Sequence, residues 1–130
     1  MTADLRGLCF LVVEDDALVA FDLEAMLIRA GCVVLGPLGD VEHALQAAAE
    51  GSFDAALLDV HLRGAMVYPV ADILIGRKLP FLFLTGYDLR DLPSRFRDRP
   101  LTRKPYSTSS LLATLSEIMA QRQPSGSPLN

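Results

Sequence analysis

The sequence predicts an α/β protein in which helices cover both faces of a parallel sheet. Apolar runs of strand length alternate five times with segments of helical pattern. The apolar runs are continuous, which is typical of strands that are buried on both faces. With 130 residues, 51% of them hydrophobic, the chain has the size and the apolar content of one domain with a substantial core.

The first predicted strand and helix occupy residues 8–13 and 17–30. The strand reads LCFLVV, and the helical segment places Leu23 and Met26 on one apolar face. Gly31 ends this helix, because glycine readily adopts the left-handed conformation that follows a helix.

The next three elements are a strand, a helix and a strand. Residues 32–36, CVVLG, have the β-branched composition of a short strand. Asp40 is placed to cap a helix over 41–50, which Gly51 stops. Residues 54–59, DAALLD, form the third apolar run, and it ends on an acid.

A third helix is predicted over 67–77, with Pro69 in its first turn, where proline is tolerated. Residues 80–85, PFLFLT, form the fourth strand. The fourth helix is expected to be short or irregular, because Pro93 and Pro100 leave room for a turn or two at most.

The fifth strand is short and lies within residues 100–105. Ser107 or Thr108 then caps a final helix that reaches residue 122 and carries an apolar stripe. The tail, residues 123–130, has no apolar pattern and is expected to be disordered.

Charged and polar residues follow the predicted strands. They are Glu14 and Asp15 after the first, Asp59 after the third, Thr85 after the fourth and Lys104 after the fifth. In a parallel sheet these positions share one edge, where ligands bind. Clustered carboxylates favour a divalent cation, and Mg²⁺ prefers oxygen ligands. An aspartate beside such an ion can attack phosphorus, while lysine and threonine hold phosphoryl oxygens.

Each of these residues also has a simpler interpretation. Aspartate at a strand end is often a helix cap, and Asp16 is expected to cap the helix that follows it. A lone threonine is usually a strand residue, and a lone lysine is usually a solvated charge. His61 does not suggest zinc, because no second ligand has zinc-like spacing. The joint placement at four strand ends is what favours a site.

These residues and their spacing resemble the response-regulator receiver domains, over residues 5–122. The resemblance implies a flavodoxin-like sheet with strand order 2-1-3-4-5. It implies that Asp59 accepts a phosphoryl group, with Thr85 and Lys104 contacting that group, and that the peptide bond from Lys104 to Pro105 is cis.

The same resemblance implies a Mg²⁺ site. Its ligands would be Asp15, Asp59 and the backbone carbonyl of His61, with Glu14 acting through water. The family usually has proline four residues after the acceptor, where this chain has Arg63. The aromatic residue usual three positions before the lysine is Leu101 here.

The stretch FLFLTGY and the short region after it resemble a subgroup of single-domain receivers called FATGUY regulators. This implies a single-domain response regulator that takes phosphate from a histidine kinase, of the HWE or HisKA2 type, and is not a metabolic enzyme. The output would be altered contact with a protein target that the sequence does not specify, or service as a phosphate sink. The alternatives are a pseudo-receiver that binds without phosphate, and a small Mg²⁺-dependent phosphatase.

Composition bears on partners and location. A net charge of −4 argues against nucleic acid as a partner. No apolar stretch reaches the roughly 18 residues that span a membrane, and the N-terminus lacks a signal-peptide pattern, so we expect a cytoplasmic protein. Cys9 and Cys32 are expected to be free thiols more than a disulfide.

Overall fold

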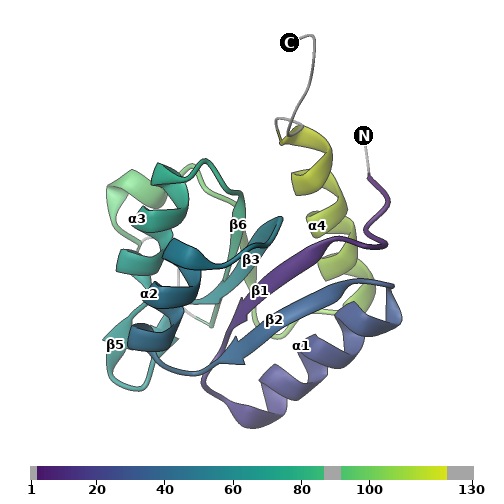
Figure 1. Cartoon of the computed structure of the whole chain (residues 1–130). Coiled ribbons are helices and arrows are strands. Elements are labelled where there is room, and N and C mark those ends of the chain that lie inside the picture. The colour runs from purple at the N-terminus through teal and green to yellow at the C-terminus, as the bar shows by residue number, and fades with distance from the viewer. Residues whose placement is uncertain (1–2, 87–91, 123–130) are drawn as a thin grey trace, which may run out of the picture.

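The structure is a computed structural model that describes residues 3–86 and 92–122 (Figure 1). Its main sheet has five parallel strands in the order β2-β1-β3-β6-β7. The strands are β1 (Cys9–Val13), β2 (Val33–Leu38), β3 (Ala55–Asp59), β6 (Phe81–Thr85) and β7 (Leu101–Arg103). Since β6 and β7 are the predicted fourth and fifth strands, the predicted 2-1-3-4-5 order is confirmed. The predicted disorder of 123–130 lies outside the described residues.

Four α-helices of the described residues cover the sheet, two on each face (Figure 1). They are α1 (Ala17–Arg29), α2 (Val41–Glu50), α3 (Tyr68–Gly76) and α4 (Thr108–Gln121). Helices α2 and α3 pack in one apolar cluster with the sheet, and α1 and α4 pack in the other. The protein therefore has the three-layer architecture that the sequence predicted.

Successive strand residues enter opposite cores. In β1, Leu11 and Val13 belong to the α2–α3 side, whereas Phe10 and Val12 belong to the α1–α4 side. All four are completely buried. Side chains of a strand alternate between the two faces, so a strand with a core on each side must be apolar at every position.

Three helices begin at side-chain caps. The carboxylate of Asp16 accepts hydrogen bonds from the backbone amides at the start of α1. Asp40 caps α2 in the same way, and the hydroxyl of Ser107 accepts from the Ser110 amide at the start of α4. The predictions for Asp16 and Asp40 are confirmed, and of the two candidates for α4 the cap is Ser107.

Strand β2 extends beyond its predicted end at residue 36. The peptide bond between Gly36 and Pro37 is cis, and the pairing with β1 shifts register before Val13 meets Leu38. Gly36 has φ +104°, and a β-carbon there would lie 2.8 Å from the carbonyl oxygen of Val12. Glycine is therefore required at this bend. The strand continues past it to Leu38, whose carbonyl accepts a hydrogen bond from the amide of Glu14.

A small hairpin, β4 (His61–Leu62) paired with β5 (Ala65–Met66), was not predicted. Its two turn residues, Arg63 and Gly64, have φ of +41° and +82°. Positive φ at both central residues is the mark of a type I′ turn. The hairpin follows directly from β3 and leads into α3, which begins at Tyr68 with Pro69 in its first turn.

The described part of the region between β6 and β7 contains a single 3₁₀ turn, Ser94–Phe96, as the prolines predicted. Phe96 is fully buried there. Its ring stacks on Tyr68 at 5.3 Å and meets Phe83 edge-on at 5.4 Å, measured between ring centroids. Aromatic contacts thus anchor the described part of this region to the core.

None of the helices in the described part of the chain has the length and apolar character that crossing a membrane requires. Cys9 and Cys32 are both free thiols, as expected.

We expect Phe96→Ala to lower the free energy of unfolding by about 3–5 kcal/mol, because it empties a fully buried aromatic site. Chemical denaturation measures this change. Arg97→Ala is the matched control, since Arg97 is exposed on the same turn, and its effect should stay within about 0.5 kcal/mol. A loss below about 1 kcal/mol for Phe96→Ala would contradict the anchoring role.

Candidate functional site

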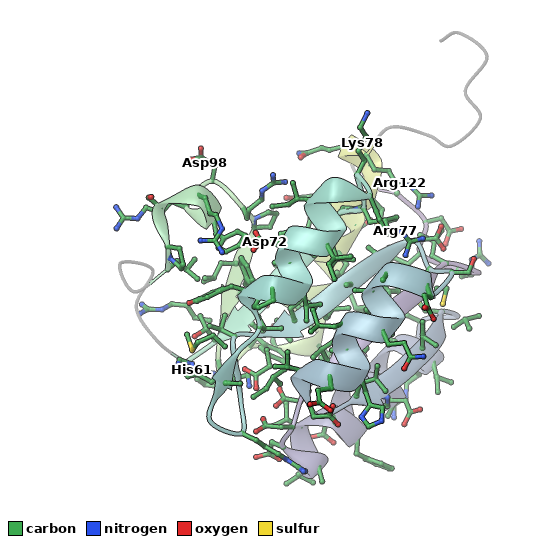
Figure 2. The ribbon with its side chains drawn as sticks, turned by 60° about the vertical axis from the view of Figure 1, so that its left-hand side comes forward. His61, Asp72, Arg77, Lys78, Asp98 and Arg122 are labelled. Atoms are coloured by element: carbon green, nitrogen blue, oxygen red, sulfur yellow. The ribbon has the colours of Figure 1, made fainter. Side chains whose placement is uncertain are left out.

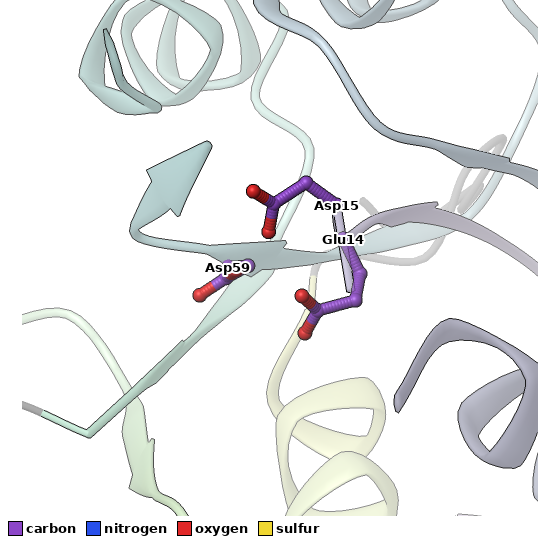
Figure 3. Close-up of side chains that lie close together, drawn as sticks. All are labelled: Glu14, Asp15 and Asp59. Atoms are coloured by element: carbon purple, nitrogen blue, oxygen red, sulfur yellow. The ribbon is translucent and has the colours of Figure 1, made fainter. Parts of the chain in front are cut away.

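The carboxyl edge of the sheet gathers the residues that the sequence placed at strand ends. Glu14 and Asp15 follow β1, and Asp59 is the last residue of the neighbouring β3. Figure 3 shows the three side chains directed toward one another from these two strand ends. Thr85 ends β6, and Lys104 follows β7. The predicted gathering is therefore present in the structure.

The three carboxylates form one compact cluster. One ligand oxygen from each of Glu14, Asp15 and Asp59 lies within 4.8 Å of the others. Only 3% of the Glu14 surface and 7% of the Asp59 surface is exposed, so water screens these charges poorly. Mutual repulsion of buried carboxylates opposes the charged state of the cluster.

Lys104 brings a positive charge into this cluster. Its ammonium lies 2.9 Å from Oε1 of Glu14 and 3.3 Å from Oδ1 of Asp59. Its backbone amide donates to the Thr85 carbonyl at 2.8 Å, which fixes the start of the loop after β7. When all three carboxylates are ionised they outnumber this ammonium, so the cluster retains excess negative charge.

The electrostatics of the cluster appear in the pKa of Asp59. Burial, and then the hydrogen bond and charge of Glu14, raise the pKa of Asp59 from 3.8 to about 7, although Lys104 opposes the shift. For Lys104, burial acts to lower the pKa, but the interactions with Glu14 and Asp59 outweigh it and raise the pKa overall. An additional cation would thus stabilise the ionised form of Asp59.

Asp15 is held differently from its neighbours. The backbone amide of Arg63, in the hairpin turn, donates to Oδ2 of Asp15 at 2.9 Å. Partial burial acts to raise the pKa of Asp15, but the bond from Arg63 and the contacts with Asp59 and Glu14 outweigh it and lower this pKa. As the pH falls, Asp15 therefore keeps its charge longer than Asp59 does.

Thr85 and His61 occupy the positions expected for them. Thr85 is 3% exposed at the end of β6, where it pairs with Arg103 of β7. His61 begins β4, two residues beyond Asp59, and its exposed side chain lies at the end of the molecule opposite Lys78 and Arg122 (Figure 2). The roles of the Thr85 hydroxyl and the His61 carbonyl stay predictions.

The donor set fits a hard divalent cation. Carboxylate oxygens are ligands that Mg²⁺ prefers, and the cluster carries the excess negative charge that such an ion offsets. Within residues 3–86 and 92–122, this is the one group of three such side chains close enough to hold a metal, and it contains no histidine. The chemistry agrees with the Mg²⁺ prediction and gives no support to zinc.

Comparison with known proteins identifies the family. The chain is 37% identical to SdrG of Sphingomonas melonis Fr1, whose solution structure superposes with a TM-score of 0.76 over 90% of this chain and 98% of that one. It is 26% identical to the response-regulator receiver domain of Erythrobacter litoralis PhyR, with a TM-score of 0.79 over 94% and 97% of the two chains. The chain belongs to the response-regulator receiver family. It is accordingly a receiver domain of two-component signalling, and the predicted resemblance is confirmed.

Among curated proteins, this receiver domain is 32% identical to the transcriptional regulatory protein PdtaR of Mycobacterium tuberculosis over 109 residues. Those residues make up 81% of the chain but 53% of PdtaR, so the chain spans about half the length of this relative. No protein-family model matches the chain. The peptide bond from Lys104 to Pro105 is cis, as the resemblance implied.

One contact in the receiver site was missed by sequence reasoning, the bond from the Arg63 amide to Asp15. The sequence signal that could have revealed its turn is the dipeptide of Arg63 and Gly64 between two residue pairs, HL and AM. A glycine in the second position favours a two-residue hairpin turn, but pairs of residues are too short to show strand periodicity.

We expect the stability of the metal-free protein to fall as the pH rises from about 4 to about 7. The pKa of Asp59 is about 7 in the folded state and near 3.8 in the unfolded chain, so the folded state binds more protons in this window. This stabilisation is complete below pH 4 and lost above pH 7. Lys104 contributes a constant amount here, because its raised pKa lies above 10.5.

The variant Asp59→Asn has no such charge and should exceed the wild type in stability at pH 8 by ~1–2 kcal/mol, after allowance for solvent screening. Denaturant unfolding with chelator at pH 5 and pH 8 measures the difference. The control is Asp98→Asn, which replaces an exposed aspartate just after the 3₁₀ turn Ser94–Phe96 (Figure 2). It should leave stability unchanged at both pH values. A less stable Asp59→Asn at pH 8 would show that repulsion does not dominate the site.

Proposed function

We propose that this receiver domain accepts a phosphoryl group on Asp59 from a phosphohistidine of a histidine kinase, with Mg²⁺ as cofactor. The observation that carries the proposal is the position of Asp59, which ends β3 within a cluster of two further carboxylates and 3.3 Å from the Lys104 ammonium. A carboxylate nucleophile, a cation site and a fixed ammonium are the parts that phosphoryl transfer needs.

The metal would be held by Asp15, Asp59 and the carbonyl of His61, with Glu14 acting through water. When bound, Mg²⁺ supplies positive charge that offsets the carboxylates and the phosphoryl oxygens. Asp15 is suited to direct ligation because it is ionised and its Oδ2 is already fixed by the Arg63 amide. The excess negative charge of the cluster supports the presence of a cation at this edge.

In the proposed transfer, a carboxylate oxygen of Asp59 attacks phosphorus in line with the phosphorus–nitrogen bond of the donor. That bond breaks, its electron pair stays on the imidazole nitrogen, and an acyl phosphate forms on Asp59. The Lys104 ammonium then pairs with one phosphoryl oxygen, as it now pairs with Asp59. The Thr85 hydroxyl donates to a second phosphoryl oxygen from the end of β6.

Two alternatives have less support. A pseudo-receiver would not need the buried cluster of acids and lysine, whose repulsion destabilises the fold without any gain. A phosphatase of the aspartate type needs a second aspartate as acid or base beyond the nucleophile, and the residue two beyond Asp59 is His61. We therefore propose an acceptor with self-catalysed transfer and hydrolysis and no metabolic substrate.

The partners are proposed as a kinase and a protein target. The FLFLTGY stretch supports a kinase of the HWE or HisKA2 type, and the likeness to SdrG and PhyR supports an output through phosphorylation-dependent protein contacts or phosphate traffic. A cytoplasmic location agrees with the two free thiols, which persist in a reducing compartment.

Mg²⁺ should stabilise the folded protein by mass action. At a concentration ten times its Kd, we expect the melting temperature to rise by roughly 3–5 °C relative to protein in chelator. Asp15→Asn removes a ligand and should lose most of this rise, whereas Asp98→Asn should keep it. Equal melting temperatures of the wild type with saturating Mg²⁺ and with chelator would count against a metal site.

The acceptor assignment predicts that Asp59→Asn takes no phosphoryl group. The wild type, Asp59→Asn and Asp98→Asn are incubated with phosphoramidate and Mg²⁺, and intact-protein mass spectrometry follows the phosphorylated form. Label is expected on the wild type and on Asp98→Asn, because both retain the carboxylate nucleophile. Stoichiometric labelling of Asp59→Asn would show that another residue is the acceptor.

A further inference from the structure

The hairpin turn beside the acid cluster contacts Asp15 through its backbone. The amide of Arg63 donates to Oδ2 of Asp15 at 2.9 Å, between residues 48 positions apart in the sequence. We propose that Arg63 is a positioning residue, whose backbone amide holds the Asp15 carboxylate in the orientation that metal binding requires. This inference rests on the proposed function.

The conformation of the turn is unusual for an arginine. Arg63 has φ +41°, a region that residues other than glycine rarely occupy and that is energetically unfavourable for an L-residue. Gly64 follows at φ +82°, and together they form the two-residue turn. A costly conformation at one residue, directly against a candidate ligand, indicates that the amide direction is what the turn supplies.

The hairpin is fixed firmly enough to aim this amide. Leu62, just before the turn, is 1% exposed, and Val67 at the base is completely buried. The amide of Val67 donates to the carbonyl of Val60 at 2.9 Å, which closes the hairpin onto the end of β3. The Arg63 amide is therefore carried by the strand that ends in Asp59, and it sets Asp15 relative to Asp59.

The bond leaves half of the Asp15 carboxylate available. A carboxylate has two oxygens, and with Oδ2 accepting from Arg63 the other oxygen can face a cation. Partners of this kind orient metal ligands and raise metal affinity. Without the amide, repulsion from Glu14 and Asp59 would favour rotation of Asp15 away from the cluster.

The guanidinium of Arg63 is a separate feature from the amide. A β-carbon built on Gly39 would lie 3.9 Å from Nη2 of Arg63 and 3.5 Å from Cα of Asp15, so the side chain lies along the connection between β2 and α2. The charge of Arg63 also contributes, behind the bonds from His43, to the lowered pKa of Asp40. The amide and the guanidinium can thus be separated by substitution.

Two variants make this separation. Arg63→Pro removes the amide hydrogen and cannot adopt positive φ, whereas Arg63→Asn keeps the amide, tolerates this conformation and removes the guanidinium. We expect the Kd for Mg²⁺, measured by calorimetric titration, to rise about tenfold or more in Arg63→Pro and to stay within about threefold of the wild type in Arg63→Asn. The rate of labelling by phosphoramidate at low Mg²⁺ should follow the same order.

Melting in chelator separates positioning from folding. If the turn is only structural, Arg63→Pro will have a lower melting temperature in chelator and an unchanged Mg²⁺ affinity. Amide hydrogen exchange of the wild type and Asp15→Ala, both in chelator, provides a test that needs no proline variant. Asp15→Ala should speed exchange at Arg63 by about tenfold or more and leave exchange at Val67 unchanged, because only the first amide loses its acceptor.

The outcomes decide between the possibilities. Equal Mg²⁺ affinity in Arg63→Pro and Arg63→Asn, whether both retained or both lost, would overturn the amide role. An exchange rate at the Arg63 amide that is the same in the wild type and in Asp15→Ala would also overturn it. If Arg63→Pro does not fold, the exchange measurement alone decides. A wild type that binds Mg²⁺ but takes no phosphoryl group from phosphoramidate would overturn the proposed function while leaving the positioning result standing.

Discussion

Repulsion among three clustered carboxylates, two of them buried, is the constraint around which this receiver domain is organised. One carboxylate oxygen from each of Glu14, Asp15 and Asp59 lies within 4.8 Å of the others at this edge of the sheet, and the ammonium of Lys104 contacts Glu14 and Asp59. Such a cluster lowers the free energy of unfolding, so burial of apolar side chains in the two cores must offset its cost. Burial and then the interactions with Glu14 raise the pKa of Asp59, so a cation that arrives at this edge would stabilise its ionised form.

The topology explains why the charges meet at this edge. In a parallel sheet all carboxyl ends point the same way, and β1 and β3 are neighbours at the place where the strand order reverses. The acids that follow β1 therefore face the acid that ends β3. The same parallel arrangement places both faces under helices, and with Glu14 and Asp59 buried at the strand ends the electrostatic interaction between them is strengthened.

Features that depend on residue type and spacing along the chain could be predicted from the sequence. Features that depend on backbone conformation or on contacts between distant residues could not. The acids at the ends of β1 and β3, the caps at Asp16 and Asp40 and the short turn in the described part of the region between β6 and β7 follow from residue type and spacing. The continuation of β2 through Pro37 could not be predicted, because proline is tolerated inside a strand only at a sheet edge or a bulge, and few such bonds are cis. The hydrogen bond from the Arg63 amide to Asp15 could not be predicted either, because every residue other than proline carries the same backbone donor.

The run of Glu14, Asp15 and Asp16 shows how three adjacent like charges are tolerated. Glu14 pairs with Lys104 after β7, Asp15 accepts from the hairpin that follows β3, and Asp16 caps α1. Two of these anchors come from parts of the chain that are distant in sequence. The unfolded chain therefore holds the same three charges without the partners that orient them, and it has no preformed cation site. Binding at this edge must then stabilise the folded sheet, because the carboxylate ligands come together only when β1 and β3 are both in place.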